Sequence, residues 1–259
     1  IDRRLHDPGQ LRLGRHVLAI RERRDGDRGR EGRATRHGGL FPQGRTSRCQ
    51  PAGAVRSSIE PSATLAAGAK ARELKAAGKT VYDFSLGEPD FNTPEHICQA
   101  AVEAMKQGHT HYTPASGIPQ LKQAIADYHQ RQHGLKYSPA QICVSSGAKH
   151  TIMTALYAVL NPGDQVVIPA PYWVSYSEMV KMTGAEPVVV STPASNKFKL
   201  TADQFRKACT PKTRLLMLNS PSNPTGSTYS PDELTALADV ALEKDLLVMS
   251  DEIYERLIY

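Results

Sequence analysis

Residues 212–226 read KTRLLMLNSPSNPTG. The apolar part, Arg214 to Asn219, has the length and composition of a buried strand. It passes at once into a polar loop, 220–226, whose two prolines restrict the backbone and hold the amide of Asn223 in one place. Parallel α/β sheets bind their ligands beyond the carboxyl ends of the strands, so this stretch predicts a functional loop at such an end.

The same pattern recurs outward in both directions from this stretch. Further strand-like runs are expected at Val81 to Leu86, Gln141 to Ser145, Gln165 to Pro169, Pro187 to Ser191 and Leu246 to Ser250. Helices are expected at Ser62 to Ala77, Pro94 to Lys106, Ile118 to Gln132, Thr151 to Leu160, Trp173 to Met182, Thr201 to Ala208 and Pro231 to Lys244. Short apolar strands alternating with helices predict an α/β fold, with a mostly parallel sheet covered by helices on both faces.

Three more expected strand ends carry unusual side chains. Gly147, Ala148 and Lys149 precede a helix, where small residues and free backbone amides suit a phosphate, although a plain strand-to-helix turn would look alike. Trp173, the single tryptophan, could stack on a flat ring or fill the core. Asp251 closes an apolar strand and could meet a cation or cap the next segment.

One ligand fits all of these ends together. It has a phosphate, a flat ring, a ring nitrogen that is cationic when protonated, and a phenolic oxygen, and this describes pyridoxal phosphate. Asp251 would keep the ring nitrogen protonated, Asn223 and Tyr254 would donate hydrogen bonds to the phenolic oxygen, and Trp173 would stack on the ring. The sequence therefore predicts a pyridoxal-phosphate site, and no metal site.

Residues 58–259 resemble the fold-type-I, class I aminotransferases, most of all the bacterial aspartate aminotransferase branch. The resembling segments are PSATLA (61–66), SLGEPDFNTPEHI (85–97), HYTPASGIPQL (111–121), SSGAK (145–149), PGDQVVIPAPYWVSY (162–176), KTRLLMLNSPSNPTG (212–226) and SDEIYE (250–255). The resemblance implies the large domain of that fold with its C-terminal part missing, and pyridoxal phosphate as the cofactor.

The resemblance also implies roles for individual residues. Cofactor binding falls to Tyr112, Gly147, Ala148, Lys149, Trp173, Asn223, Asp251 and Tyr254. The resemblance assigns substrate binding to Gly87, Trp173 and Asn223, and it assigns catalytic roles to Asp251 and Tyr254. In the family the tyrosine at the position of Tyr112 reaches the cofactor phosphate of the neighbouring subunit, which implies a homodimer with shared active sites.

The implied reaction moves the amino group of L-aspartate to 2-oxoglutarate, with amino acids and 2-oxo acids as substrates. Aromatic, alanine or prephenate aminotransferases and a carbon–sulfur lyase of the same fold stay open as alternatives, and Glu60 lowers the expectation of prephenate activity because a lysine is common there in that branch. The family's Schiff-base lysine lies about thirty residues beyond SDEIYE. The chain is thus expected to be an inactive fragment of an active parent, or else a noncovalent cofactor-binding module.

Residues 1–57 differ from the remainder in composition. They hold 14 Arg, no Lys and 6 acidic residues, and they contain 9 of the 19 glycines, whereas residues 58–259 carry a net charge of −2. We expect this segment to be disordered or non-native sequence, and residues 58–259 to form the N-terminal arm and an incomplete cofactor-binding domain. An aminotransferase-like regulator would need amphipathic DNA-binding helices in this segment, which shows no such period, so no nucleic-acid partner is expected.

The remaining composition suggests the compartment. No apolar run approaches the length of a membrane span, no signal-peptide core is visible, and the four cysteines are far apart in the sequence. We expect a cytoplasmic protein without a membrane partner.

Overall fold

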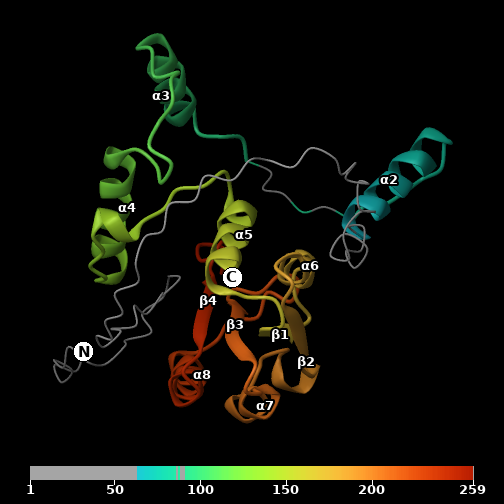
Figure 1. Ribbon diagram of the computed structural model, residues 1–259. Coiled ribbons are helices and arrows are strands. Elements are labelled where there is room, and N and C mark those ends of the chain that lie inside the picture. Colours follow the sequence, from blue (N-terminus) through green and yellow to red (C-terminus); the bar gives the residue numbers. More distant parts are fainter. Residues whose placement is uncertain (1–62, 86, 88–90, 259) are drawn as a thin grey trace, which may run out of the picture.

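The computed structural model describes residues 63–85, 87 and 91–258 (Figure 1). The predicted segment 1–57 and its boundary lie outside these residues, as do Glu60 and part of the 85–97 motif. The helices are α2 (Ala63–Ala76), α3 (Glu95–Lys106), α4 (Pro119–His133), α5 (Ala148–Val159), α6 (Ser175–Met182), α7 (Ala202–Ala208) and α8 (Pro231–Glu243), with two 3-10 turns, η1 (Pro139–Gln141) and η2 (Ala194–Asn196). The strands are β1 (Gln165–Ala170), β2 (Glu186–Ser191), β3 (Thr213–Asn219) and β4 (Leu247–Asp251).

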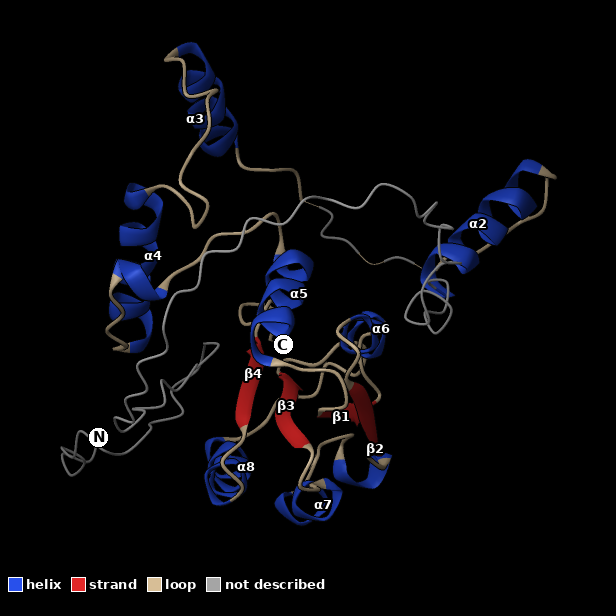
Figure 2. Cartoon of the chain, viewed as in Figure 1, coloured by secondary structure: helices blue, strands red, loops and turns tan. Residues whose placement is uncertain are grey.

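The four strands form one parallel sheet in the order β2-β1-β3-β4. Because successive side chains of a strand point to opposite faces, the sheet has two apolar faces. On one face Val166, Leu215 and Met249 pack with α5 and α6; on the other, Val167 and Leu216 pack with α7 and α8. Figure 2 shows the two pairs of helices on opposite sides of the strands. The predicted parallel α/β architecture is confirmed.

Two of the expected strands are wrong. Residues 142–145 run extended without joining the sheet, and Val81 to Ser85 form no strand either. A strand needs a hydrogen-bonding neighbour, and the amide of Val144 instead donates to the carbonyl of Ser116 in a loop, at 3.0 Å. The helix after this segment begins earlier than expected, at Ala148 rather than Thr151, which brings its first turn to the Gly147 position.

Helices α2, α3 and α4 stand apart from the sheet (Figure 1). Large apolar side chains of the segments around them are exposed, including Tyr82, Phe84, Phe91 and Met105. The parallel sheet and its four flanking helices therefore contain most of the packed core, and several of the predicted site residues, among them Asn223 and Asp251, lie at the sheet's carboxyl edge.

Candidate active site

Strands β3 and β4 end side by side, with Asn219 in register with Asp251. The side-chain amide of Asn219 donates to the backbone carbonyl of Asp251 at 2.8 Å, and its amide oxygen accepts a hydrogen bond from the backbone N–H of Asn223 at 2.7 Å. Asn219 thus joins the end of one strand to the loop that follows the other. These bonds hold the predicted residues Asp251 and Asn223 at the same edge of the sheet.

The carboxylate of Asp251 is oriented by two donors. Tyr176 on α6 donates its hydroxyl to Oδ2 at 2.7 Å, and the backbone N–H of Ile253 donates to Oδ1 at 3.2 Å. Tyr176 is 2% exposed. Burial, and after it the negative charge of Asp251, raise the pKa of the Tyr176 hydroxyl far above its usual value. Tyr176 is therefore a protonated donor throughout the physiological pH range.

Trp173 extends this arrangement to the turn before α5. Its ring meets the Tyr176 ring edge-on, with centroids 5.4 Å apart and an interplanar angle of 89°. The ammonium of Lys149 lies over the Trp173 ring, 4.9 Å from its centroid, at the distance of a cation–π contact. Lys149, Trp173, Tyr176 and Asp251 thus form a continuous series of contacts between α5, α6 and β4.

The turn before α5 has the form of an anion site. Gly147 precedes the helix with φ at 85°, a conformation that L side chains rarely adopt, and a Cβ there would meet no atom within 4 Å. The amides of His150 and Thr151 donate to the Gly147 carbonyl at 3.1 and 3.2 Å. The amides before them, of Ala148 and Lys149, precede the first helical hydrogen bond, and the helix dipole adds positive potential there. Ala148, the first residue of α5, and Asp251 line the same open hollow of about 220 Å³ between α5 and β4, so the helix N-terminus and the carboxylate face one space.

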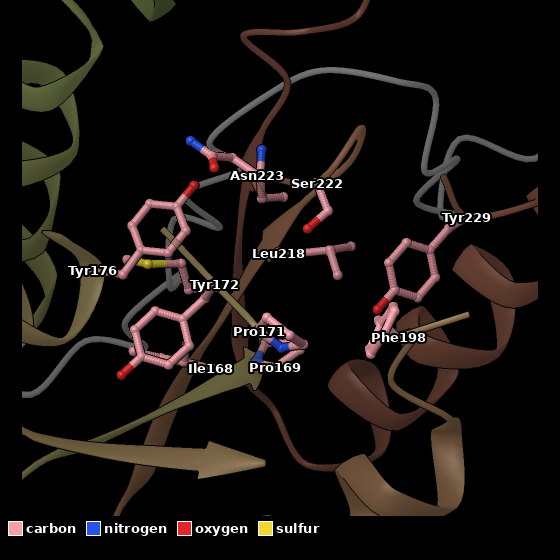
Figure 3. A pocket seen from close by; sticks show the side chains of 12 residues that line it. Ile168, Pro169, Pro171, Tyr172, Tyr176, Phe198, Leu218, Ser222, Asn223 and Tyr229 are labelled. Carbon is pink, nitrogen blue, oxygen red and sulfur yellow. The ribbon is translucent and has the colours of Figure 1, made fainter. Parts of the chain in front are cut away.

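Asn223 and Tyr254, both predicted to bond the cofactor's phenolic oxygen, lie within hydrogen-bonding distance of each other. The Asn223 side-chain amide donates to the Tyr254 hydroxyl at 3.4 Å. Asn223 also lines a small second cavity of about 20 Å³ beside the site (Figure 3), where it lies with Tyr176 on one side while Phe198 and Tyr229 form the other. Asn223 therefore lies at this small cavity and in reach of the Tyr254 hydroxyl at the same time.

A comparison with known protein families identifies the family of the chain. The family described as aminotransferase class I and II matches residues 79–259, which include every predicted site residue. The chain belongs to this aminotransferase family.

Individual aminotransferases show the same likeness. The aspartate aminotransferase of Bacillus subtilis (strain 168) is 51% identical over 203 residues, 78% of this chain and 52% of its own length. The aspartate/prephenate aminotransferase of Cereibacter sphaeroides is 49% identical over 78% of this chain and 50% of its own length. The structure of the Thermus thermophilus aspartate aminotransferase with maleate superposes with a TM-score of 0.76, at 44% identity over 79% of this chain and 54% of that one. The chain thus spans about half the length of the relatives it matches.

Two of the predicted site residues lie away from the others. Gly87 is exposed in the segment before α3, and Tyr112, between α3 and α4, is fully exposed. Neither belongs to an element of the sheet. Their roles in substrate and cofactor binding stay predictions. Among the described residues, no helix has both the length and the apolar character to cross a membrane.

Sequence reasoning missed two residues of the site, Tyr176 and Asn219. Tyr176 lies three residues after Trp173, and its backbone amide donates to the Trp173 carbonyl at 3.0 Å, so the two rings meet within a single turn. Residues three apart are neighbours on a helical turn, so this spacing could have predicted that the Tyr176 ring lies beside the Trp173 ring. Asn219 ends its strand, as Asp251 does. A polar residue at the carboxyl end of an apolar strand could have predicted that Asn219 lies at the site.

Proposed function

We propose that the whole protein is a pyridoxal-phosphate-dependent aspartate aminotransferase that transfers the amino group of L-aspartate to 2-oxoglutarate. One observation carries the proposal. A carboxylate, Asp251, and the first residue of α5, Ala148, line the same hollow, and the contacts Asp251–Tyr176, Tyr176–Trp173 and Trp173–Lys149 connect the carboxylate to the first turn of that helix. A ligand with a phosphate at one end and a cationic ring at the other is complementary in charge to this helix N-terminus and this carboxylate.

The residues present fit the cofactor. The turn at Gly147 is open where a Cβ would stand, so a phosphate can approach the first-turn amides of α5. Asp251, oriented by Tyr176, would hold a proton on the ring nitrogen, and Trp173 would cover one ring face. Asn223 and Tyr254 would donate to the phenolic oxygen. Bound pyridoxal phosphate supplies an electron sink that stabilises negative charge at the substrate α-carbon.

The proposed substrate is supported by the relatives. Those most similar to this chain include proteins named aspartate aminotransferase, and the Thermus thermophilus structure contains maleate, a dicarboxylate of the same chain length as aspartate. Gly87 would contact the substrate's α-carboxylate, with Trp173 and Asn223 beside it. We place the protein in the cytoplasm, in amino-acid biosynthesis, as a homodimer in which Tyr112 serves the neighbouring subunit's cofactor phosphate.

Prephenate is the second candidate amino acceptor. The relative from Cereibacter sphaeroides, named an aspartate/prephenate aminotransferase, is almost as similar to this chain as the aspartate enzymes. A panel of oxo acids offered to the whole protein with aspartate as donor separates the two. Turnover with 2-oxoglutarate but not prephenate supports the first assignment, and comparable turnover with both supports the second.

Replacement of Asp251 tests the function itself. In the whole protein loaded with pyridoxal phosphate, Asp251→Ala should lower kcat/KM for aspartate by about a hundredfold or more, because a preorganised charge that acts on the reacting system is lost. Asp203→Ala, at an aspartate whose side chain is 84% exposed on α7, is the control and should leave turnover unchanged. Near-normal turnover of the Asp251 variant would contradict the assignment.

A further inference from the structure

Helix α4 is tied to the turn after β4 by a set of side chains far apart in sequence. Tyr128 on α4 donates its hydroxyl to Oε1 of Glu255 at 2.6 Å, across 127 residues. Nη2 of Arg256 donates to the Tyr128 hydroxyl at 2.8 Å and to Oε1 of Gln132 at 3.2 Å. Nε2 of His133 lies 3.6 Å from Oε2 of Glu255. We call these five side chains, Tyr128, Gln132, His133, Glu255 and Arg256, the α4 cluster.

The Glu255 carboxylate is the centre of the α4 cluster. Its two oxygens face Tyr128 and His133 respectively, and Nε of Arg256 lies 3.4 Å from Oε1. The side chains of Glu255 and His133 are 24% and 14% exposed, so their interaction is largely shielded from water. The His129 ring packs against those of Tyr128 and His133, at centroid distances of 5.6 Å from each. This surrounding gives the carboxylate one well-defined position.

Glu255 directly follows Tyr254 in a tight turn. The Glu255 amide donates to the carbonyl of Glu252 at 2.9 Å, and the Leu257 amide donates to the carbonyl of Tyr254 at 2.8 Å. The hydroxyl of Tyr254 itself meets Asn223 at only 3.4 Å, near the upper limit for a hydrogen bond. The position of the Tyr254 side chain therefore depends on how firmly its turn is fixed, and Glu255 fixes that turn to α4.

We propose that Glu255 is a positioning residue, which through Tyr128 and His133 fixes the turn that presents Tyr254 to the cofactor's phenolic oxygen. Helix α4 thereby contributes to the active site although its own side chains do not touch it. The inference rests on the proposed function, because Tyr254 acts on a bound cofactor only if the protein binds one.

A double-mutant cycle in the whole, cofactor-loaded protein tests this. Tyr128→Phe removes the donor to Glu255 and should lower kcat/KM about tenfold, short of the hundredfold that a displacement of about 1 Å can cause. It should also raise the pH at which the visible absorbance of the bound cofactor changes, because a hydrogen bond from Tyr254 favours the anionic phenolic oxygen. In a Tyr254→Phe background, Tyr128→Phe should change neither quantity, since no hydroxyl remains to be positioned.

The controls separate positioning from folding. Tyr137→Phe, whose ring packs edge-on against His129 in the same neighbourhood, should leave both readouts unchanged. If Tyr128→Phe does not fold, Glu255→Gln is taken through the same cycle, because it keeps the side chain's shape and removes its charge. Equal effects of Tyr128→Phe with and without the Tyr254 hydroxyl, or no effect in either background, would overturn the inference while transamination stands. Absence of cofactor absorbance from the unmodified protein would overturn the proposed function and this inference together.

Discussion

The hydroxyl of Tyr176 is the closest side-chain contact of the Asp251 carboxylate. The bond measures 2.7 Å, and both partners are held by regular structure, one on α6 and one at the end of β4. A hydrogen bond to a charged group is stronger than one between neutral groups. Tyr176 therefore holds the Asp251 carboxylate in one orientation, which a partner for a protonated ring nitrogen requires.

Replacement of Tyr176 by Phe measures this contribution. We expect a fall of about three- to tenfold in kcat/KM for aspartate and weaker binding of pyridoxal phosphate, because Asp251 keeps only its backbone donor and its sheet position. Activity and cofactor affinity of the whole protein are the measurements. Tyr157→Phe is the matched control, since that hydroxyl also donates a hydrogen bond, to the Met182 carbonyl at 3.2 Å, but on the exposed side of α5. Equal losses in the two variants would contradict a specific role for Tyr176.

The residues of the site were predictable to different degrees. Asp251, Trp173 and Asn223 follow apolar strands, so local sequence alone is enough to place them at the carboxyl edge of the sheet. The bonds of Tyr176 and Asn219 to Asp251 span 75 and 32 residues, and only strand order and helix packing bring those segments together. Patterns within one segment carry no information about such contacts.

At the scale of elements, helix α8 packs on one face of the sheet, and its N-terminus is stabilised by side chains of its own first turn. Ser230 and Glu233 form a capping box, in which the Ser230 amide donates to Glu233 at 2.7 Å and the Glu233 amide donates to Ser230 at 3.2 Å. Lys199, in the segment before α7, forms an ion pair with the same carboxylate. The pKa of Glu233 is lowered, first by the bond from Lys199 and then by the bond from Ser230.

The lowered pKa of Glu233 determines how the contribution of this residue to folding stability changes with pH. Because Glu233 ionises more readily in the folded protein, its contribution to stability is present above the ordinary value of 4.5 and is lost as the pH falls through the lower folded value. Glu233→Gln should reduce the free energy of unfolding by about 0.5–1 kcal/mol at pH 7, the size of a partly exposed ion pair. The difference should shrink below pH 4.5.

Thermal unfolding of the whole protein at several pH values is the measurement. Glu95→Gln, in the first turn of α3, is the control for the loss of a first-turn carboxylate. It should lower the free energy of unfolding by less than Glu233→Gln does. A stability difference for Glu233→Gln that persists unchanged at acid pH would show that lost packing, not lost charge, is responsible.

The elements themselves were predicted well where their partners lie within the described chain. All four strands of the sheet have apolar runs, which pack on both faces in β1, β3 and β4 and on one face in the edge strand β2, and their expected positions agree with the structure within two residues. The run Gln141 to Ser145 has the same apolar character, yet it forms no strand, because strand formation needs a neighbouring backbone and not composition alone. Pairing is a property of two segments, which one segment's sequence cannot specify.

At the scale of the whole molecule, large aromatic side chains stand out from the segments around α3. Tyr82, Phe84, Phe91 and Tyr112 are 84–108% exposed. Large aromatic side chains that are this exposed are typical of surfaces that a partner covers. The proposed homodimer would cover this region and would place Tyr112 at the active site of the other subunit, so that each site would combine Tyr112 of one subunit with Asp251 of its partner.

Mixing two inactive variants of the whole protein tests the shared site. Tyr112→Ala and Asp251→Ala should each be strongly impaired alone. If both are co-expressed in equal amounts, half of the dimers are mixed, and each mixed dimer has one site with both residues intact, so about a quarter of the unmodified activity should return. If Tyr112 served its own subunit, every site in the mixture would lack one of the two residues. No activity would then return, and a steady-state assay of the mixture against each variant alone distinguishes the two arrangements.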